Sequence, residues 1–504
     1  MNLDYRKKQL DAIEQIDFDA VIVGGGISGA VVFHHLAQCG FRVLLLEKGD
    51  FAGGTSQSSA MMVWGNLTDL RQLSLLRVGR SCASRENLIR RKSDWVFPQK
   101  FRYLPVKNGR NAFSSYAAFY SYWILGAGRR SFPRYKKEFV ESAFLKRENF
   151  PYSFEYEEAC VEPSDARFVL GWILNQPNTF EQTALNYCQL SGGHYETSDK
   201  HWHLEINDSI CQRELVIKAK CVVNTAGVWT DKLNQQFGIN SPYKHVFGKG
   251  VFLGIKRPSN HQLTLMIETE DEEGCLALIP WREISLWGPT ETHITNLDEG
   301  FAATPEDIRF LLNQINRHVS ELISIKDIVS LRCGVRPLPI QGTFSDKNTF
   351  GVPRHYKAFA DKQLPWISIY GGKITSSLLA AQTVESFLKD YKLLPSLSAP
   401  NFSPLDISQP ELESFPNLSE KVPSVRWCAE KEMCWNLEDY LRRRTNISQW
   451  IPRGGLGLAN ENSSHLREIA KIFCNNDESK VSASINDYQE KIKREFDDVL
   501  AQAA

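Results

Sequence analysis

The sequence contains no run of 18 apolar residues and no C-x-x-C pair. The first absence excludes a predicted membrane-spanning helix, and the second excludes a common motif of zinc sites and thioredoxin-like redox sites. Residues 1–15 are polar and mixed in charge, so we expect no signal peptide. The eleven cysteines are scattered and odd in number, which favours reduced thiols in a cytoplasmic protein over a disulfide framework.

Net charge is also absent from the chain. Lys and Arg together number 59, and so do Asp and Glu. A neutral chain has no overall field that would attract a nucleic acid, and we expect no nucleic-acid partner. With 504 residues, of which 42% are hydrophobic, the chain is globular and long enough for two or three domains.

A strand, a glycine-rich turn, a helix and a second strand follow one another near the N-terminus. The apolar run 19–23 precedes Gly24-Gly25-Gly26, residues 27–38 carry apolar side chains at helical spacing, and 41–46 is a second apolar run. This order within about 30 residues predicts a βαβ unit.

The glycines of this unit, Gly24, Gly26 and Gly29, are spaced as G-x-G-x-x-G. In a dinucleotide site the first allows a tight turn, the second lets the backbone approach a pyrophosphate, and the third lets helix and strand pack closely. The helix N-terminus then offers free N–H groups to the phosphates. Glu47 follows the second strand, where an acid can accept hydrogen bonds from ribose hydroxyls and disfavours a 2′-phosphate. These residues predict a dinucleotide site that does not take NADP.

Two further short apolar runs end at glycines. Residues 222–227 read Val-Val-Asn-Thr-Ala-Gly, and 366–370 precede Gly371-Gly372. We expect these strands to join the N-terminal pair in one sheet, with the substrate segments inserted between them. The segments 150–215 and 245–295 are rich in Val, Ile, Trp and Phe with turn residues between them, which favours an antiparallel substrate sheet.

The C-terminal part of the chain has a different pattern. Prolines punctuate a linker after residue 400, and 426–446 and 464–473 are predicted helices. We therefore expect a small helical domain from about residue 405 to the end of the chain.

Several stretches, in this order along the chain, resemble the FAD-dependent glycerol-3-phosphate dehydrogenase family, within the D-amino-acid-oxidase-like flavoproteins. They are VIVGGGISGA, LLLEKGDFAGGTSQSS, VVNTAGVWTDKL, FGKG, LIPW with LWGPTE, LRCGVRPLP, ISIYGGKITSS and RWCAEKEMCWNLEDYLRRRT, and together they cover about residues 17–450. The first motif is common to many flavoproteins, whereas GVRPL, GGKxT and the late helix are more specific to this family.

The resemblance implies an α/β fold with a FAD-binding Rossmann-like domain of the glutathione-reductase/DAO type, an antiparallel-sheet substrate domain and a small C-terminal helical domain. We assign the FAD-binding domain to residues 17–90, 150–245 and 330–395, the substrate domain to 91–149 and 246–329, and the helical domain to 405–504.

The resemblance also implies which residues hold FAD and which face the substrate. The expected FAD-binding residues are Gly24, Gly26, Ile27, Ser28, Gly29, Glu47, Lys48, Thr55, Ser56, Ala226, Gly227, Gly372, Lys373, Ile374 and Thr375. Arg336, in GVRPL, is expected to bind the anionic end of the substrate, since a guanidinium can donate two parallel hydrogen bonds to a phosphate or carboxylate. Lys373 is expected to stabilise negative charge on the reduced flavin or the substrate oxygen.

The sequence departs from the family pattern at two places. Where the family reads K-[LI]-[IV]-H-G-G-L-R-Y-L, Trp64 stands for the histidine, and Thr68 and Asp69 stand for the arginine and tyrosine, with one residue inserted. Where the family reads K-G-S-H, Phe252 replaces the histidine. One phosphate contact and one candidate base are therefore missing. Arg71 is a substitute for the arginine if its segment is helical.

These departures leave the substrate and the base open. His245 lies near the lost histidine in sequence, but a lone histidine is more often structural. The first interpretation is hydride transfer from a small hydroxylated substrate to flavin, with quinone or oxygen as electron acceptor. The alternatives are an amine or amino-acid oxidase of the same fold group, and a flavoprotein whose catalytic site has decayed.

A basic segment bears on where the protein acts. Residues 91–137 contain eleven basic residues and one acid, Asp94, a balance of 11 − 1 = +10, and they enclose the aromatic stretch 113–125. Aromatic side chains flanked by basic ones suit peripheral contact with the inner face of a membrane. A core helix with a solvated basic rim, or a dimer surface, is the alternative.

Overall fold

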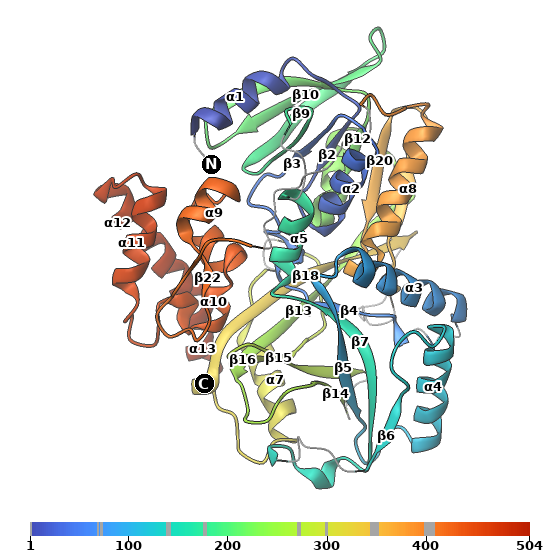
Figure 1. Cartoon of the computed structure of the whole chain (residues 1–504), viewed down its shortest axis with the longest axis vertical. Coiled ribbons are helices and arrows are strands. Elements are labelled where there is room, and N and C mark those ends of the chain that lie inside the picture. Colours follow the sequence, from blue (N-terminus) through green and yellow to red (C-terminus); the bar gives the residue numbers. More distant parts are fainter. Residues whose placement is uncertain are drawn as a thin grey trace.

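The computed structural model describes residues 3–67, 70, 74–137, 143–174, 179–269, 274–297, 301–342, 352–397 and 409–504. Thr68, Asp69 and Arg71, which the sequence analysis singled out, lie outside the described residues. The chain folds around two large sheets, one above the other in Figure 1, with a group of helices from the C-terminal part of the chain along one side.

The upper sheet has six strands, ordered β19-β20-β12-β2-β3-β8. Its members are β2 (Ala20–Val23), β3 (Val43–Leu46), β8 (Gln182–Leu185), β12 (Val222–Asn224), β19 (Lys357–Ala360) and β20 (Trp366–Tyr370). All adjacent pairs are parallel except β19 with β20. The expectation that the glycine-ended strands share one sheet is confirmed.

Helices pack against this parallel sheet. Helix α2 (Ile27–Gln38) has the bounds expected from its apolar spacing, and Gly40, with φ +84°, follows its end. It packs along α8 (Ser377–Asp390) and α5 (Asp165–Leu174). Because the sheet is covered, its strands are almost continuously buried, as expected of a parallel sheet.

A separate four-stranded sheet lies at the top of Figure 1, beside helix α1 (Leu3–Ile13). It has the order β1-β11-β10-β9, from β1 (Asp17–Phe18), β9 (Cys188–Glu196), β10 (His201–Asp208) and β11 (Arg213–Ala219). The expectation that the whole segment 150–215 contributes to the substrate sheet was therefore wrong. The inner side chains of β9–β11 are buried against the outer face of the six-stranded sheet, where Trp202 meets Trp366 with ring centroids 5.3 Å apart.

The lower sheet has ten strands, eight of them on its main path, and is mostly antiparallel. The order is β17-β13-β16-β15-β14-β5-β7-β4, and β18 pairs with β13 and β6 with β7. The bounds are β4 (Met62–Val63), β5 (Val96–Leu104), β6 (Arg134–Lys136), β7 (Ser153–Val161), β13 (Tyr243–Lys256), β14 (Thr264–Glu268), β15 (Cys275–Trp281), β16 (Ile284–Gly288), β17 (Thr292–Ile294) and β18 (Ile328–Gln341).

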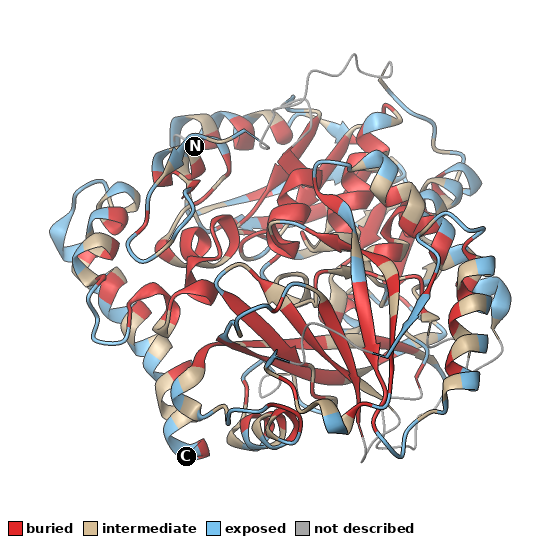
Figure 2. Cartoon of the chain, turned by 60° about the horizontal axis from the view of Figure 1, so that its bottom comes forward, coloured by how far each residue is buried: buried red, intermediate tan, exposed pale blue. Residues whose placement is uncertain are grey.

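The helices around the lower sheet are amphipathic. Helix α7 (Pro305–Asn316) begins with a capping box at Thr304 and Asp307 and buries one apolar side. Helices α3 (Leu75–Arg91) and α4 (Ala112–Leu125) lie at the opposite side of the sheet (Figure 1). In Figure 2 the strands are largely buried, while the helices at the periphery alternate between buried and exposed sides. The cores of both sheets are thus covered.

The C-terminal part is helical, as expected. It contains α9 (Val425–Lys431), α10 (Ile447–Trp450), α11 (Ser463–Phe473), α12 (Glu478–Ile492) and α13 (Asp498–Ala503), with a π-helical turn at Asp439–Arg444. The predicted helix 426–446 was wrong as a single element, because Met433 has φ +48° and the chain leaves helical geometry between α9 and the π-helical turn.

The fold class is confirmed, whereas the domain boundaries stay a proposal. The predicted boundaries at 245 and 330 fall within β13 and β18 of the lower sheet. Strand β7 also belongs to that sheet, although 150–245 was assigned to the FAD-binding domain. All eleven cysteines are free thiols.

Candidate functional site

The carboxyl ends of four parallel strands meet at one edge of the upper sheet. Strand β2 runs into Gly24, β3 into Glu47, β12 into Thr225 and β20 into Gly371. In open α/β sheets ligands bind outside such strand ends. A cavity of about 2140 Å³ opens there and continues between the two large sheets.

Nearly all the residues that the sequence analysis assigned to FAD line this cavity. They are Gly24, Gly26, Ile27, Ser28, Glu47, Lys48, Thr55, Ser56, Ala226, Gly227, Gly372, Lys373, Ile374 and Thr375, and Arg336 lines it as well. Gly29 lies behind the wall, where α2 packs against the strand ends. The structure thus brings together residues as far apart in the chain as Gly24 and Thr375.

The glycines of the turn have distinct steric reasons to be glycine. Gly24 has φ +108°, and a Cβ there would lie 2.6 Å from the carbonyl oxygen of Thr225. A Cβ on Gly29 would lie 1.9 Å from the carbonyl oxygen of Gly24. At Gly26 the nearest atom to a Cβ would be Ser56 Oγ, at 3.1 Å, so its missing side chain leaves room for a ligand at the start of α2.

Glu47 is buried and is held by backbone donors. The N–H of Gly25 donates to its Oε2 at 2.7 Å, and the N–H of Gly49 donates to its Oε1 at 2.9 Å. Burial raises the pKa of Glu47, and the two N–H groups oppose that shift. A carboxylate has about four acceptor positions, so two remain free to accept hydrogen bonds from hydroxyl groups of a ligand.

The loop after Glu47 is fixed to three parts of the protein. Ser56 Oγ accepts from the N–H of Ile27 at 2.9 Å, and Thr55 Oγ1 donates to the carbonyl of Val335 at 2.5 Å. Lys48 Nζ lies 3.7 Å from the ring centroid of Trp229. The loop therefore connects the start of α2 with the strand that carries Arg336.

At the other end of the cavity, the 371–375 turn packs against the altered segment near residue 64. Thr375 Oγ1 accepts from the N–H of Trp64 and donates to its carbonyl, both at 3.1 Å. Lys373 Nζ donates to Asn66 Oδ1 at 2.6 Å. Trp64 thus occupies the wall beside the turn that carries Lys373.

Two arginines and a glutamate form a charged part of the cavity wall. Arg336 Nη1 and Arg354 Nη2 donate to the same oxygen of Glu291, at 2.7 and 2.9 Å. All three residues line the cavity. Burial lowers the pKa of Arg336 to about 10, against the opposing effect of Glu291, so the guanidinium stays charged at neutral pH.

The backbone makes room for Arg336. Residues 248 and 336 pair across β13 and β18, and a Cβ on Gly250 would lie 2.2 Å from Arg336 Nη2. The second glycine of the FGKG stretch therefore has a steric reason, because the guanidinium of Arg336 lies across it. Sequence reasoning identified Arg336 but assigned no role to Glu291, although it ends the LWGPTE stretch, and missed Arg354, which lies in no motif quoted above.

The histidines separate into structural and cavity-lining ones. His245 donates through Nδ1 to Asp231 at 3.2 Å and accepts at Nε2 from the N–H of Gly371 at 3.2 Å, with a fully buried side chain. It supports the turn from behind and does not line the cavity. Phe252, at the lost histidine position, does line it, and His355 is the histidine among the described residues that reaches the wall.

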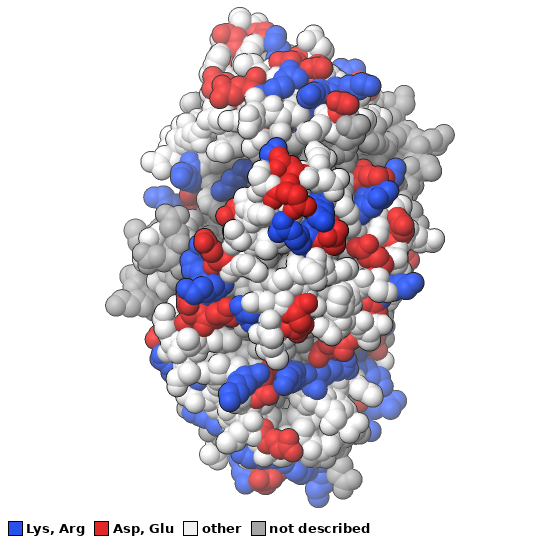
Figure 3. Space-filling view, turned by 90° about the vertical axis from the view of Figure 1, so that its left-hand side faces the viewer, with Lys and Arg blue, Asp and Glu red and all other residues white. Residues whose placement is uncertain are grey.

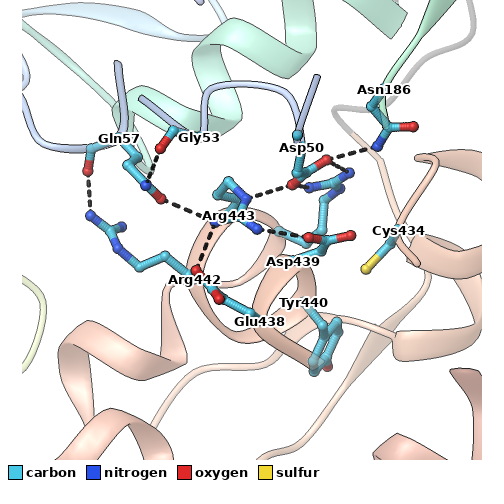
Figure 4. A network of polar contacts seen from close by, with 12 residues as sticks. Asp50, Gly53, Gln57, Asn186, Cys434, Glu438, Asp439, Tyr440, Arg442 and Arg443 are labelled. Carbon is cyan, nitrogen blue, oxygen red and sulfur yellow. Dashed lines mark hydrogen bonds and ion pairs between the residues drawn. The ribbon is translucent and has the colours of Figure 1, made fainter. Parts of the chain in front are cut away.

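The buried carboxylate of Asp50 connects the loop of residues 50–57, here called the cofactor loop, to the C-terminal helical part of the chain (Figure 4). Asp50 accepts two hydrogen bonds from Arg444, at 2.6 and 2.9 Å, and one from Arg443 at 2.5 Å. Burial opposes ionisation, but the two guanidinium groups outweigh it and keep the pKa of Asp50 below its usual value. Arg443 also donates to Asp439 and to Gln57, and both Asp50 and Arg443 line the cavity.

The family match decides the identity of this cavity. Residues 19–378 match the FAD dependent oxidoreductase (DAO) family. The chain belongs to this family. Within it, the aerobic glycerol-3-phosphate dehydrogenase of Escherichia coli (strain K12) is 27% identical over 385 residues, 74% of each chain. The D-erythritol 1-phosphate dehydrogenase of Brucella abortus (strain 2308) is 27% identical over 370 residues, 71% of each chain.

Solved structures share the fold of this flavoprotein. The glycerol-3-phosphate dehydrogenase of Bacillus halodurans, complexed with FAD, has a TM-score of 0.70 at 19% identity and covers 97% of both chains. The L-alpha-glycerophosphate oxidase of Mycoplasma pneumoniae, with FAD bound, has a TM-score of 0.56 at 13% identity over 74% of this chain and 95% of its own. The chain is thus a divergent member of the group that its motifs resembled.

The cavity suits FAD on three observations. The glycine turn has no room for side chains, Glu47 retains acceptor capacity at the end of β3, and the space continues to the 371–375 turn. The protein is an FAD-dependent oxidoreductase, and we propose that these residues hold the two ends of the cofactor.

We expect Gly29→Ala to prevent cofactor retention. The added Cβ would meet the carbonyl oxygen of Gly24 at 1.9 Å and would push α2 away from the turn. The measurement is the ratio of flavin to protein absorbance after purification, which should fall close to zero. Gly79→Ala is the matched control, because its Cβ would make only an ordinary contact at 3.7 Å; equal flavin in both variants would contradict the assignment.

We expect Arg443→Met to weaken both the fold and FAD binding. It removes one partner of the buried carboxylates Asp50 and Asp439, a change that costs about 3–5 kcal/mol when charges are left uncompensated. Urea unfolding and titration of the apoprotein with FAD measure the two effects. Arg494→Met, at a side chain 72% exposed, should change neither; an unchanged FAD affinity in Arg443→Met would show that the network does not act on the cofactor loop.

Proposed function

We propose that this enzyme oxidises a small phosphorylated polyol and passes the hydride to FAD. The observation that carries the proposal is the pair of arginines, Arg336 and Arg354, on the cavity wall that also contains Lys373. With Glu291 between them the group keeps a positive charge, and two guanidinium groups match a phosphate dianion. The similarity to dehydrogenases named for glycerol 3-phosphate and erythritol 1-phosphate supports the same substrate class.

Each part of the wall has a role in this proposal. When bound, FAD supplies the hydride acceptor. Arg336 and Arg354 bind the phosphate and so orient the carbon chain, while Lys373 faces the oxygen on which negative charge develops. Asn66 Oδ1 holds the ammonium group of Lys373 in place through the 2.6 Å hydrogen bond. His355 is the proposed proton acceptor, since Phe252 cannot take a proton and His245 is turned to the backbone.

The arginine pair also replaces what the sequence lost. Arg354 supplies a second guanidinium at the substrate end, where Thr68 stands for the arginine of the family pattern. A monoanionic amino acid would need one such contact, which makes an amino-acid oxidase the second candidate. The large side chains of Trp64, Tyr156, Phe252 and Met266 line the same cavity, and in this proposal they exclude water from the reacting carbon.

Anaerobic addition of substrates to the oxidised enzyme tests the proposal. We expect glycerol 3-phosphate or erythritol phosphate to bleach the flavin, whereas glycerol and glycine leave it yellow. Bleaching by amino acids alone would favour the oxidase, and no bleaching by any compound would indicate a decayed site.

Variants then separate the roles. Arg336→Met should lower kcat/KM about ten- to hundredfold, because a hydrogen bond to a charged group contributes about 1.5–3 kcal/mol. His355→Asn should lower kcat at little change in KM. Arg494→Met serves as the control for a lost surface charge.

We further propose that the enzyme rests on the cytoplasmic face of a membrane and passes its electrons to a quinone there. Helix α4 exposes Phe113 and Ile124, at 83% and 65% of their surface, and Leu76 at the start of α3 is 82% exposed. The lining of the cavity includes Leu75 of α3 and Phe119 of α4, so the cavity extends to these two helices. Within the described residues, the helices are too short or too polar to cross a bilayer.

Basic side chains surround the exposed apolar ones. The exposed basic residues of the segment are Arg91, Lys100, Lys107, Arg129, Arg134, Lys136 and Lys137. Acids from elsewhere reduce the local balance of +10, since Arg102 pairs with Glu155 and Arg130 with Glu86 and Glu157. The face that carries the C-terminal helices is different: there Lys and Arg alternate with Asp and Glu (Figure 3). The α3–α4 face is therefore the better candidate for anionic lipid.

Co-sedimentation with vesicles of anionic lipid tests this contact. We expect Phe113→Ser combined with Ile124→Ser to reduce the bound fraction at low salt, because the apolar insertion is lost. Added salt should release the unmodified protein, since it screens the basic residues. Leu458→Ser, at a 70% exposed leucine of the C-terminal part, is the control; equal binding of both variants would place the contact elsewhere.

A further inference from the structure

A histidine, a cysteine and a glutamate meet where α2 and α8 pack together, away from the proposed cofactor residues. His35 and Cys39, at the C-terminal end of α2, are four residues apart and share one side of the helix. Glu385 faces them from α8. The possible ligand atoms of the three all lie within 4.8 Å of one another, and all three residues are partly accessible.

The chemistry of this group points to a borderline transition metal. Thiolate, imidazole and carboxylate are the ligands that Zn²⁺ uses, with bond lengths of about 2.0–2.3 Å. Mg²⁺ and Ca²⁺ prefer oxygen ligands and would not select a cysteine and a histidine. Three protein ligands leave the fourth tetrahedral position to water, which the partial exposure of the group allows.

The neighbouring contacts suit a metal ligand set. His35 Nε2 and Glu385 Oε2 are 2.7 Å apart, so both already point to one place. The other oxygen of Glu385 is 2.6 Å from Lys389 Nζ, a contact that orients the carboxylate. Burial raises the pKa of the Cys39 thiol, with a further contribution from Glu385; a bound cation would reverse that effect and favour the thiolate.

The position gives such a site a structural consequence. Helix α2 begins at the glycine turn, and α8 follows the 371–375 turn, so the N-terminal ends of both helices face the cavity. The metal would join the two helices at the other end of α2. We propose that His35, Cys39 and Glu385 form a Zn²⁺-binding site that fastens α2 to α8.

The alternative is an ion pair between His35 and Glu385 beside an uninvolved thiol. Calorimetric titration of chelator-treated holoenzyme with Zn²⁺ distinguishes the two. We expect one Zn²⁺ per chain, a rise in the thermal unfolding temperature with added Zn²⁺, and protection of Cys39 from alkylation as read by peptide mass analysis. Mg²⁺ at the same concentration should produce none of these effects.

Two variants and a control complete the test. Cys39→Ser and Glu385→Gln should each weaken Zn²⁺ binding at least about tenfold and remove the thermal shift, while their flavin content shows that they are folded. Cys474→Ser, at another partly accessible cysteine, should bind as the unmodified protein does. Absence of Zn²⁺ binding, or equal binding by Cys39→Ser and Cys474→Ser, would overturn the proposal.

Discussion

The close approach of α2 to the ends of β2 and β12 is the constraint on which the cofactor site depends. There is no space for a Cβ at Gly29 or Gly24, where the nearest carbonyl oxygens would be 1.9 and 2.6 Å away. Because the helix can come this near, its first turn and the strand ends share one cavity with Glu47 and the 371–375 turn. The loop of residues 50–57 then has only a short distance to cover between α2 and β18. The proposed cofactor and substrate residues therefore share one cavity because of the same backbone packing.

The parts of the structure that could be predicted are those whose residues lie close together in the sequence. The βαβ unit is local: strand, glycines, helix and acid lie within 30 residues, and α2 has the expected bounds. The three-dimensional neighbours of Arg336 are not local. Glu291 ends the LWGPTE stretch, but its place beside Arg336 depends on the pairing of β13 with both β17 and β18, and Arg354 lies in no quoted motif. The segment 188–219 alternates like any half-buried sheet, and nothing in that pattern tells which partner covers it. The break after α9 depends on a positive φ at Met433. A methionine in the sequence does not predict such a conformation, since positive φ angles are uncommon in residues other than glycine.

The substrate end shows how a divergent member can keep a charge pattern while its motif changes. The hydroxyl of Thr375 hydrogen-bonds to both the N–H and the carbonyl of Trp64. The absence of a side chain at Gly65 leaves space for the hydroxyl of Tyr122, because a Cβ at Gly65 would lie 2.1 Å from that oxygen. Behind them Glu158 accepts from Arg85, Tyr122 and the N–H of Gly65. The altered segment is thus held by a buried network of its own. The positive charge that we propose for binding an anionic substrate comes from β18 and the residues that follow it.

The C-terminal part of the chain contacts the loop after Glu47 through buried charged groups, Asp50 on the loop and Arg443 and Arg444 on the helical part. A buried carboxylate is costly unless it is paired and hydrogen-bonded, and removal of one partner is then more harmful than loss of a surface pair. Asp50 satisfies that requirement with Arg443, Arg444 and an amide hydrogen bond from Asn186. Asp50 is only three residues after Glu47. Further along the same loop, Arg442 donates to the carbonyl of Gln57 and Arg443 to its side-chain oxygen. Ser56 Oγ accepts from the N–H of Ile27 at the start of α2. The loop of residues 50–57 is thus bound both by the arginines of the C-terminal part and by the start of α2. A movement of the helical part would therefore shift the residues around the proposed cofactor.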